Sequence, residues 1–123
     1  MHQFSFEKLE VWQLARKLTV DIYKISQSFP SDEKFLLTSQ LRRAAMSVGA
    51  NISEGSTRTT SKDKAHFTTI AYSSLMELFN HLMIATDLKY ITENDLVNFR
   101  EQIKNLAVKL SNLKSVQLRQ FIK

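Results

Sequence analysis

Turn-forming residues are almost absent from this chain, and their scarcity limits the fold more than any other feature. Of the 123 residues, two are glycine, Gly49 and Gly55, and one is proline, Pro30. A β-sandwich or β-barrel needs many tight turns, which depend on these residue types. A glycine-rich phosphate loop needs several glycines close together. The sequence therefore excludes both and favours long helices with few connections.

Apolar residues recur at spacings of three and four in the first half of the chain, which is the period of an amphipathic helix. This pattern predicts helices over residues of about 7–28 and 32–55. Pro30 should stop the first helix, because proline disfavours the helical conformation at the residue before it. Phe29 is expected to turn back into the core, and Ser31 to cap the second helix.

The same period predicts two more helices, over residues of about 61–89 and 93–118. Thr60 or Ser61 is the expected N-cap of the third helix, and Thr92 caps the fourth. The fourth has the most regular heptad spacing in the chain, at Leu96, Phe99, Ile103, Leu106, Leu110 and Leu113.

The pattern predicts four helices of matched length, joined by three short connections. Gly55 is placed to end the second helix, and the Ser- and Thr-rich run 56–61 is the clearest loop. Short connections favour antiparallel neighbours. We therefore predict an all-α protein, an antiparallel up-down-up-down four-helix bundle that forms a single domain over residues 1–123.

Composition removes several classes of function. The chain has no cysteine, so it has no disulfide, thiol nucleophile or cysteine-based zinc site. His66 and His81 are four helical turns apart, about 22 Å, and no second histidine–carboxylate pair accompanies Glu77 and His81. No nucleophile motif or compelling acid–base pair is present. We expect no metal, no cofactor and no catalysis. Without a signal peptide or membrane-spanning stretch, the simplest location is the cytoplasm.

Basic residues give the strongest suggestion of a ligand, because 17 Lys and Arg outnumber 12 Asp and Glu. Arg42, Arg43 and Arg58 are the leading candidates for phosphate contacts, since a guanidinium binds two oxygens at once. Consecutive residues point about 100° apart on a helix, so one of the first two could instead pair with Glu54 or Glu77. Three lysines of the fourth helix are auxiliary candidates, or part of a solvated face: Lys104, Lys109 and Lys114.

A second group of polar residues is spaced for one helical face. Asn51, Glu54 and Arg58 follow at intervals of three and four, and Glu54–Arg58 is a favourable pair. With Glu77, Asn51 and Glu54 are candidates for a structural polar site at the end of the bundle. The alternative is that they only end the helix and anchor the loop.

The first and third helices carry more apolar residues than a bundle interior needs. An exposed apolar patch on a small helical protein usually covers a partner. The surplus predicts a homo-oligomer, although wide stripes around an irregular core would give the same pattern. The candidate interface residues are Val11, Tyr23, Tyr72, Met76 and Phe79.

One long segment is distinctive. Residues 29–58 read FPSDEKFLLTSQLRRAAMSVGANISEGSTR, and their centre combines QLRRAA with NISEG. Upstream lie the segments LEVWQLA and IY, and downstream lie HF, IA and SLMEL. This order resembles the four-helix bundle family first noticed in intervening sequences of bacterial 23S rRNA genes and often labelled a ribosomal protein. The resemblance covers residues of about 4 to 91, and the fourth helix matches only in pattern.

The resemblance implies an antiparallel four-helix bundle that assembles into a pentamer, without an established activity. Many members have proline where this chain has Gly49, so the helix there could be straighter or looser. A similar bundle accompanies the reverse transcriptases of diversity-generating retroelements, where it is thought to bind nucleic acid and the enzyme. Two hypotheses follow. The chain is a non-enzymatic oligomer that binds RNA or DNA through a basic surface, or an oligomeric adaptor that holds a protein partner such as a reverse transcriptase.

Overall fold

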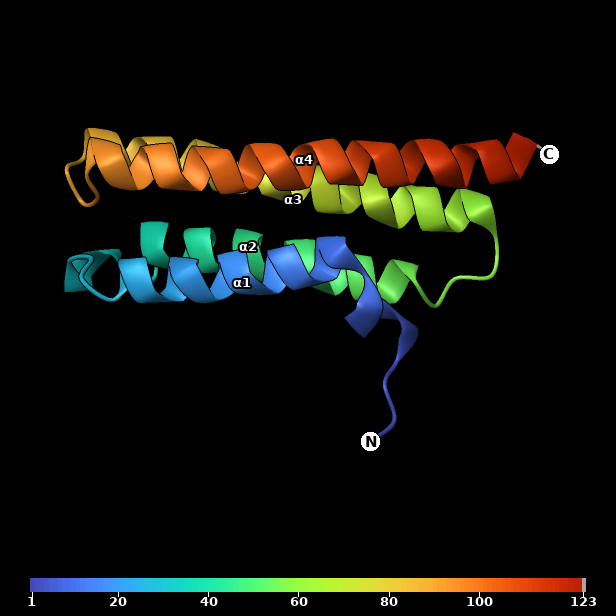
Figure 1. Cartoon of the computed structure of the whole chain (residues 1–123). Coiled ribbons are helices and arrows are strands. Elements are labelled where there is room, and N and C mark those ends of the chain that lie inside the picture. Colours follow the sequence, from blue (N-terminus) through green and yellow to red (C-terminus); the bar gives the residue numbers. More distant parts are fainter. Residues whose placement is uncertain (123) are drawn as a thin grey trace.

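The computed structural model of the chain is a bundle of four helices (Figure 1). It describes the backbone of residues 1–122 and the side chains of residues 1–119, and this part contains no strand. The helices are α1 Glu10–Ser26, α2 Leu37–Gly55, α3 Ser61–Asp87 and α4 Glu93–Ile122, with two short 3-10 turns, η1 Ser5–Lys8 and η2 Ser31–Glu33. Lys123, the last residue of the predicted domain, lies outside the described residues.

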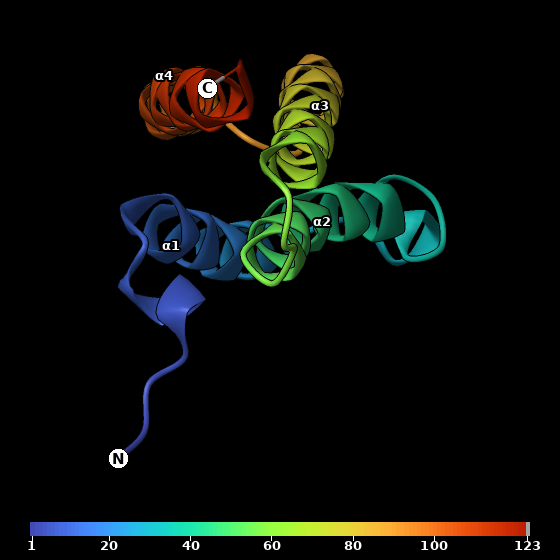
Figure 2. The same ribbon diagram turned by 90° about the vertical axis from the view of Figure 1, so that its right-hand side faces the viewer.

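Consecutive helices run in opposite directions and pack side by side (Figure 1). Helix α2 packs against α1 and α3, while α4 packs against α3 and α1, so α2 and α4 are diagonal in the bundle. The predicted all-α, up-down-up-down four-helix bundle is confirmed. Viewed along the bundle in Figure 2, the N-terminal segment leaves the helices and projects away from them.

Apolar side chains from all four helices fill one core. Ile22, Leu41, Leu75, Leu82 and Leu110 have no exposed surface. These residues belong to the stripes of period three and four, because only one face of each helix can reach the bundle axis. Phe29 is also buried, as its position before Pro30 predicts.

The helices differ in length, against the prediction that they match. α1 and α2 have 17 and 19 residues, whereas α3 and α4 have 27 and 30. α1 starts later than predicted because the Glu7 carboxylate accepts the backbone N–H of Phe4 at 2.8 Å, which holds η1 as a separate turn. Leu9 is extended between η1 and α1.

The start of α2 also differs from the prediction. Ser31 was expected to cap a helix at 32, but residues 31–33 form η2 and α2 begins only at Leu37. The reason is a tertiary contact from the α3–α4 connection. Tyr90 donates its hydroxyl hydrogen to Glu33 Oε2 at 2.9 Å, and its ring lies 5.3 Å from that of Phe29. We call this region, where the connections 27–36 and 88–92 meet, the closed end.

Local signals define the ends of the second hairpin. Thr60 Oγ1 accepts the N–H of Asp63 at 3.1 Å, which confirms Thr60 as the N-cap of α3. Thr92 and Asp95 form a reciprocal capping box with two bonds of 3.0 Å, as predicted for α4. α3 ends at Asp87, and Lys89, two residues further on, has a φ of 68°, which lies in the left-handed region.

The two glycines have different roles. A Cβ added at Gly49 would lie 3.8 Å from Trp12 and Ala15, an ordinary contact, and α2 runs through this position without interruption. A Cβ at Gly55 would lie 2.8 Å from Phe67 Cβ. Gly55 does not have a positive φ, so it does not end α2 through the left-handed conformation that glycine favours. It lets α2 and α3 approach at what we call the open end, where residues 56–60 connect them.

Candidate nucleic-acid interface

Arg42 lies in the groove between α1 and α2 and ties the two helices together. Its Nε donates to Ser26 Oγ at 2.8 Å and its Nη2 to the Tyr23 carbonyl at 3.4 Å. The guanidinium also lies 4.6 Å from the centre of the Tyr23 ring. The Tyr23 carbonyl belongs to the last turn of α1, where carbonyls lack helical partners and a cation is favourable. Arg42 therefore has a structural role. Its two hydrogen bonds use only some of the five N–H donors of the guanidinium.

Arg43 and Arg58 differ from Arg42. Arg43 is exposed, and no hydrogen bond or ion pair holds its side chain within residues 1–119. Arg58 lies 4.6 Å from the centre of the Phe67 ring, and the predicted Glu54–Arg58 pair does not form. From Arg43 to the end of α2 at Gly55 the helix rises about 18 Å. Arg58 therefore lies at the open end, apart from the other two arginines.

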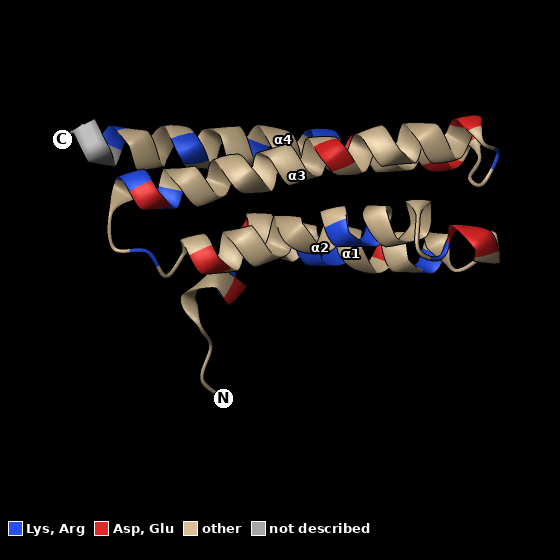
Figure 3. Ribbon diagram, turned by 180° about the vertical axis from the view of Figure 1, so that it is seen from behind, with Lys and Arg blue, Asp and Glu red and all other residues tan. Residues whose placement is uncertain are grey.

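The three α4 lysines do not join the arginines. α4 is diagonal to α2, and Lys109 Nζ pairs with Glu10 Oε1 at 2.7 Å, which connects α4 to the start of α1. Lys104 is exposed, and Lys114 is half-buried beside Thr68 and Thr69 of α3. Figure 3 shows the basic segments of α4 as separate blue patches, which lie apart from the blue segments of α1 and α2.

The structure adds one arginine to the two on α2. Arg16 lies 5.4 Å from the centre of the Trp12 ring. Trp12 adjoins Gly49, Thr19 donates to the Ala45 carbonyl at 3.1 Å, and Tyr23 contacts Met46, so this stripe of α1 faces the outer edge of α2. The spacing of residues 12, 16, 19 and 23 indicates that they share one face of α1. Only the packing register of α1 against α2 shows that this face contacts α2. We define the arginine surface as Arg16, Arg42 and Arg43 with Trp12 and Tyr23.

The predicted polar site is not assembled. Asn51 Nδ2 donates to the carbonyl and Oγ of Ser47 at 2.8 and 3.1 Å, and Ser47 Oγ lies 2.8 Å from Ser74 Oγ. This network joins α2 to α3 and satisfies half-buried polar groups. Glu54 and Glu77 are exposed, and within residues 1–119 neither forms an ion pair.

The predicted interface residues divide into two groups. Val11 is buried in the core with 7% exposed, so its assignment to an apolar surplus on the surface is wrong. Phe79 is half-buried under the Arg100 guanidinium, 4.7 Å from its ring centre. Tyr23, Tyr72 and Met76 are exposed.

The described residues contain no cluster of three or more histidines or carboxylates that would hold a metal. None of the described helices is long and apolar enough to cross a membrane. The pKa of Tyr90 is raised, because its hydrogen bond to the Glu33 carboxylate and burial favour the neutral phenol. That contact lies at the closed end and serves the fold.

These features define a class: a four-helix bundle with an arginine surface on its first hairpin and, within the described residues, no arrangement that indicates catalysis. The family follows from comparison. A model of the 23S rRNA-intervening sequence protein family matches residues 7–112, and the chain belongs to this family.

A solved structure has the same fold. It is the crystal structure of a protein of unknown function from the S23 ribosomal protein family of Bacteroides thetaiotaomicron VPI-5482. The two chains are 21% identical, the match covers 85% of this chain and 95% of the other, and the TM-score is 0.79. No curated protein matches the chain.

Proposed function

We propose that this chain is a non-enzymatic, cytoplasmic, oligomeric bundle that binds structured RNA through the arginine surface. The observation that carries the proposal is the state of its three guanidinium groups. No carboxylate within residues 1–119 lies within 4 Å of Arg16, Arg42 or Arg43. Two of the three lie over aromatic rings, which limits their side-chain freedom before a ligand arrives.

The chemistry of this surface fits a phosphate backbone. A guanidinium presents a planar fork of donors to two phosphate oxygens, and it remains charged at any physiological pH. Binding of this kind follows shape and charge more than sequence, and it weakens steeply with salt. The family's association with 23S rRNA genes is consistent with RNA but does not specify it.

The test is fluorescence anisotropy of a labelled RNA hairpin with nuclease-treated protein at about 50 and 200 mM salt. We expect the variant Arg16→Gln/Arg43→Gln to bind more weakly, with a salt slope reduced by about 2. Arg42 is left intact because it joins α1 to α2. The matched control is Lys62→Gln/Lys104→Gln, which removes the same charge from exposed positions on α3 and α4.

Two results would contradict the proposal in different ways. If both variants lost RNA affinity equally, net charge alone would explain the loss, and the arginine surface would not be the RNA-binding site. Absence of binding at 50 mM salt would remove RNA as the ligand.

The second candidate is an adaptor that holds a protein partner, such as a reverse transcriptase. Tyr72, Met76 and Met83 of α3 are each more than a third exposed and follow at helical spacing with Phe79 between them. An exposed apolar stripe of this kind favours a protein contact, either between copies in the proposed pentamer or with a partner. Met76→Glu should lower the mass measured by sedimentation velocity if the stripe joins copies. An unchanged oligomer would exclude this stripe as the contact between copies.

A further inference from the structure

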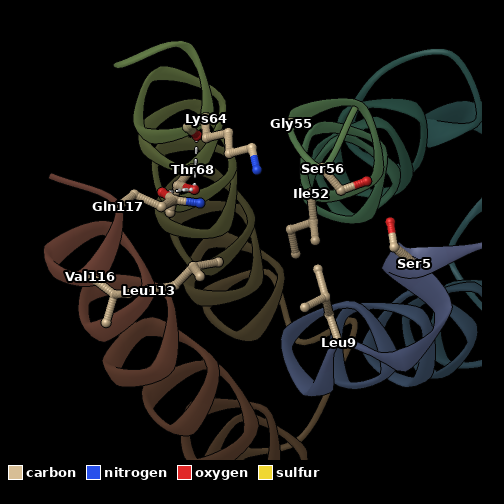
Figure 4. A pocket seen from close by; sticks show the side chains of 10 residues that line it. All are labelled: Ser5, Leu9, Ile52, Gly55, Ser56, Lys64, Thr68, Leu113, Val116 and Gln117. Carbon is tan, nitrogen blue, oxygen red and sulfur yellow. Dashed lines mark hydrogen bonds between the residues drawn. The ribbon is translucent and has the colours of Figure 1, made fainter. Parts of the chain in front are cut away.

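A cavity lies at the open end, where the α1–α2 hairpin and the α3–α4 hairpin separate. Its volume is about 280 Å³, and it is lined by residues of α2, α3 and α4 together with Ser5 and Leu9 of the N-terminal segment that precedes α1 (Figure 4). Its apolar wall consists of Leu9, Ile52, Leu113 and Val116. The cavity is partly open to solvent, and a concave, mostly apolar space with a few convergent polar groups is the usual form of a small-molecule site.

The polar side of the cavity is rich in donors. Figure 4 shows the Lys64 ammonium extending from α3 into the space between α3 and the end of α2. The Thr68 hydroxyl donates to Gln117 Oε1 at 2.8 Å, and the Gln117 amide nitrogen forms no hydrogen bond with residues 1–119. Ser5 and Ser56 contribute hydroxyl groups at the side next to α2.

No acidic residue balances this charge. None of the ten residues that line the cavity is aspartate or glutamate, and Lys64 forms no ion pair within residues 1–119. Lys64 is half-buried, so water compensates its charge less fully than it does for an exposed lysine. An anion in the cavity would supply the missing partner.

We propose that this cavity binds a small amphipathic monocarboxylate, with its carboxylate at Lys64 and its alkyl chain against Leu9, Ile52 and Leu113. At about 30 Å³ for each non-hydrogen atom, the share of a water molecule in the liquid, the volume admits about nine atoms. A straight-chain acid of about six carbons has this size. The site is separate from the arginine surface, and the inference does not depend on RNA binding.

The experiment is a titration of the whole chain with hexanoate, followed by amide chemical shifts and by calorimetry. We expect saturable binding that shifts the amides of Ile52, Gly55 and Leu113 and raises Tm with ligand concentration. Hexan-1-ol, which has the same chain without the charge, should bind about tenfold more weakly, because a charge-assisted hydrogen bond is lost.

Two matched variants assign the carboxylate. Lys64→Met should reduce hexanoate affinity about tenfold and leave that of hexan-1-ol unchanged. Lys62→Met, two residues away on the exposed side of α3, should change neither. Leu113→Phe fills the apolar side and should weaken both ligands.

The proposal fails if hexanoate gives no saturable shift up to about 10 mM, a concentration that would nearly saturate a site with a Kd of about 1 mM. It also fails if hexanoate binds no better than hexan-1-ol, or if Lys62→Met and Lys64→Met have equal effects. The amide spectrum of each free variant tests whether it is folded. If Lys64→Met is not folded, Lys64→Gln replaces it.

Discussion

The closed and open ends of the bundle are built from different contacts. At the closed end, Tyr90 joins the two hairpins through Phe29 and Glu33, and Arg42 binds the last turn of α1. At the open end, α2 and α3 meet at Gly55, and a cavity remains between the hairpins. The closed end therefore joins the two hairpins through side-chain contacts, whereas the open end leaves space between them.

The largest expected difference between the ends comes from removing a large side chain at each. Phe29→Ala should lower the free energy of unfolding by about 3 kcal/mol, because a buried aromatic ring and its contact with Tyr90 are lost. Leu113→Ala should cost about 1–2 kcal/mol, because this half-buried side chain already borders a cavity. Urea unfolding at fixed protein concentration measures both, and equal losses would contradict the distinction between the ends.

The second prediction concerns how closely the helices approach at the open end. Gly55→Ala should destabilise the protein by about 1–3 kcal/mol, because its Cβ would lie 2.8 Å from Phe67 Cβ and α2 or α3 must shift. The control is Gly49→Ala, which meets only ordinary contacts and should stabilise α2 by up to about 1 kcal/mol. Thermal unfolding of the two variants should thus move Tm in opposite directions. A rise in Tm for both would show that the open end relaxes without cost.

The third prediction tests a local signal at the closed end. Thr92→Ala removes the side-chain acceptor of the α4 capping box and should cost about 1 kcal/mol. Ser111→Ala, an exposed position in the middle of the same helix, is the control and should change stability little. Circular dichroism during urea unfolding measures both, and a similar change in both variants would show that the cap contributes nothing specific.

The contrast between local and tertiary contacts explains what the sequence could predict. The caps at Thr60 and Thr92 depend on residues three positions away, and both are confirmed. The start of α2 depends on a bond between Glu33 and Tyr90, 57 positions apart, and the prediction from local pattern is wrong. The four-helix bundle was predictable because periodicity and short connections determine it together.

The candidate site follows the same rule. Arg42 and Arg43 were identifiable from sequence as cations on one helix, but their different exposure depends on the contact of Arg42 with α1. Arg16 was missed because its position beside α2 depends on the register of two helices. Asn51 does not join Glu54 and Glu77 in a polar site, because its side chain donates to Ser47, which in turn contacts Ser74 of α3.

The smallest expected effect is a gain in stability at the end of α3. Lys89 has a φ of 68°, a conformation that costs a residue with a Cβ about 1 kcal/mol or more and costs glycine almost nothing. Its N–H bonds the Thr86 carbonyl and the N–H of Tyr90 bonds the Ala85 carbonyl, so the backbone is held in a Schellman motif. Lys89→Gly should therefore stabilise the protein by about 0.5 kcal/mol after the entropy of the unfolded glycine is deducted. Lys89→Ala removes the same charge and keeps the Cβ, so it should bring no gain. If the two variants were equally stable, the charge of Lys89 and not its backbone would explain the change.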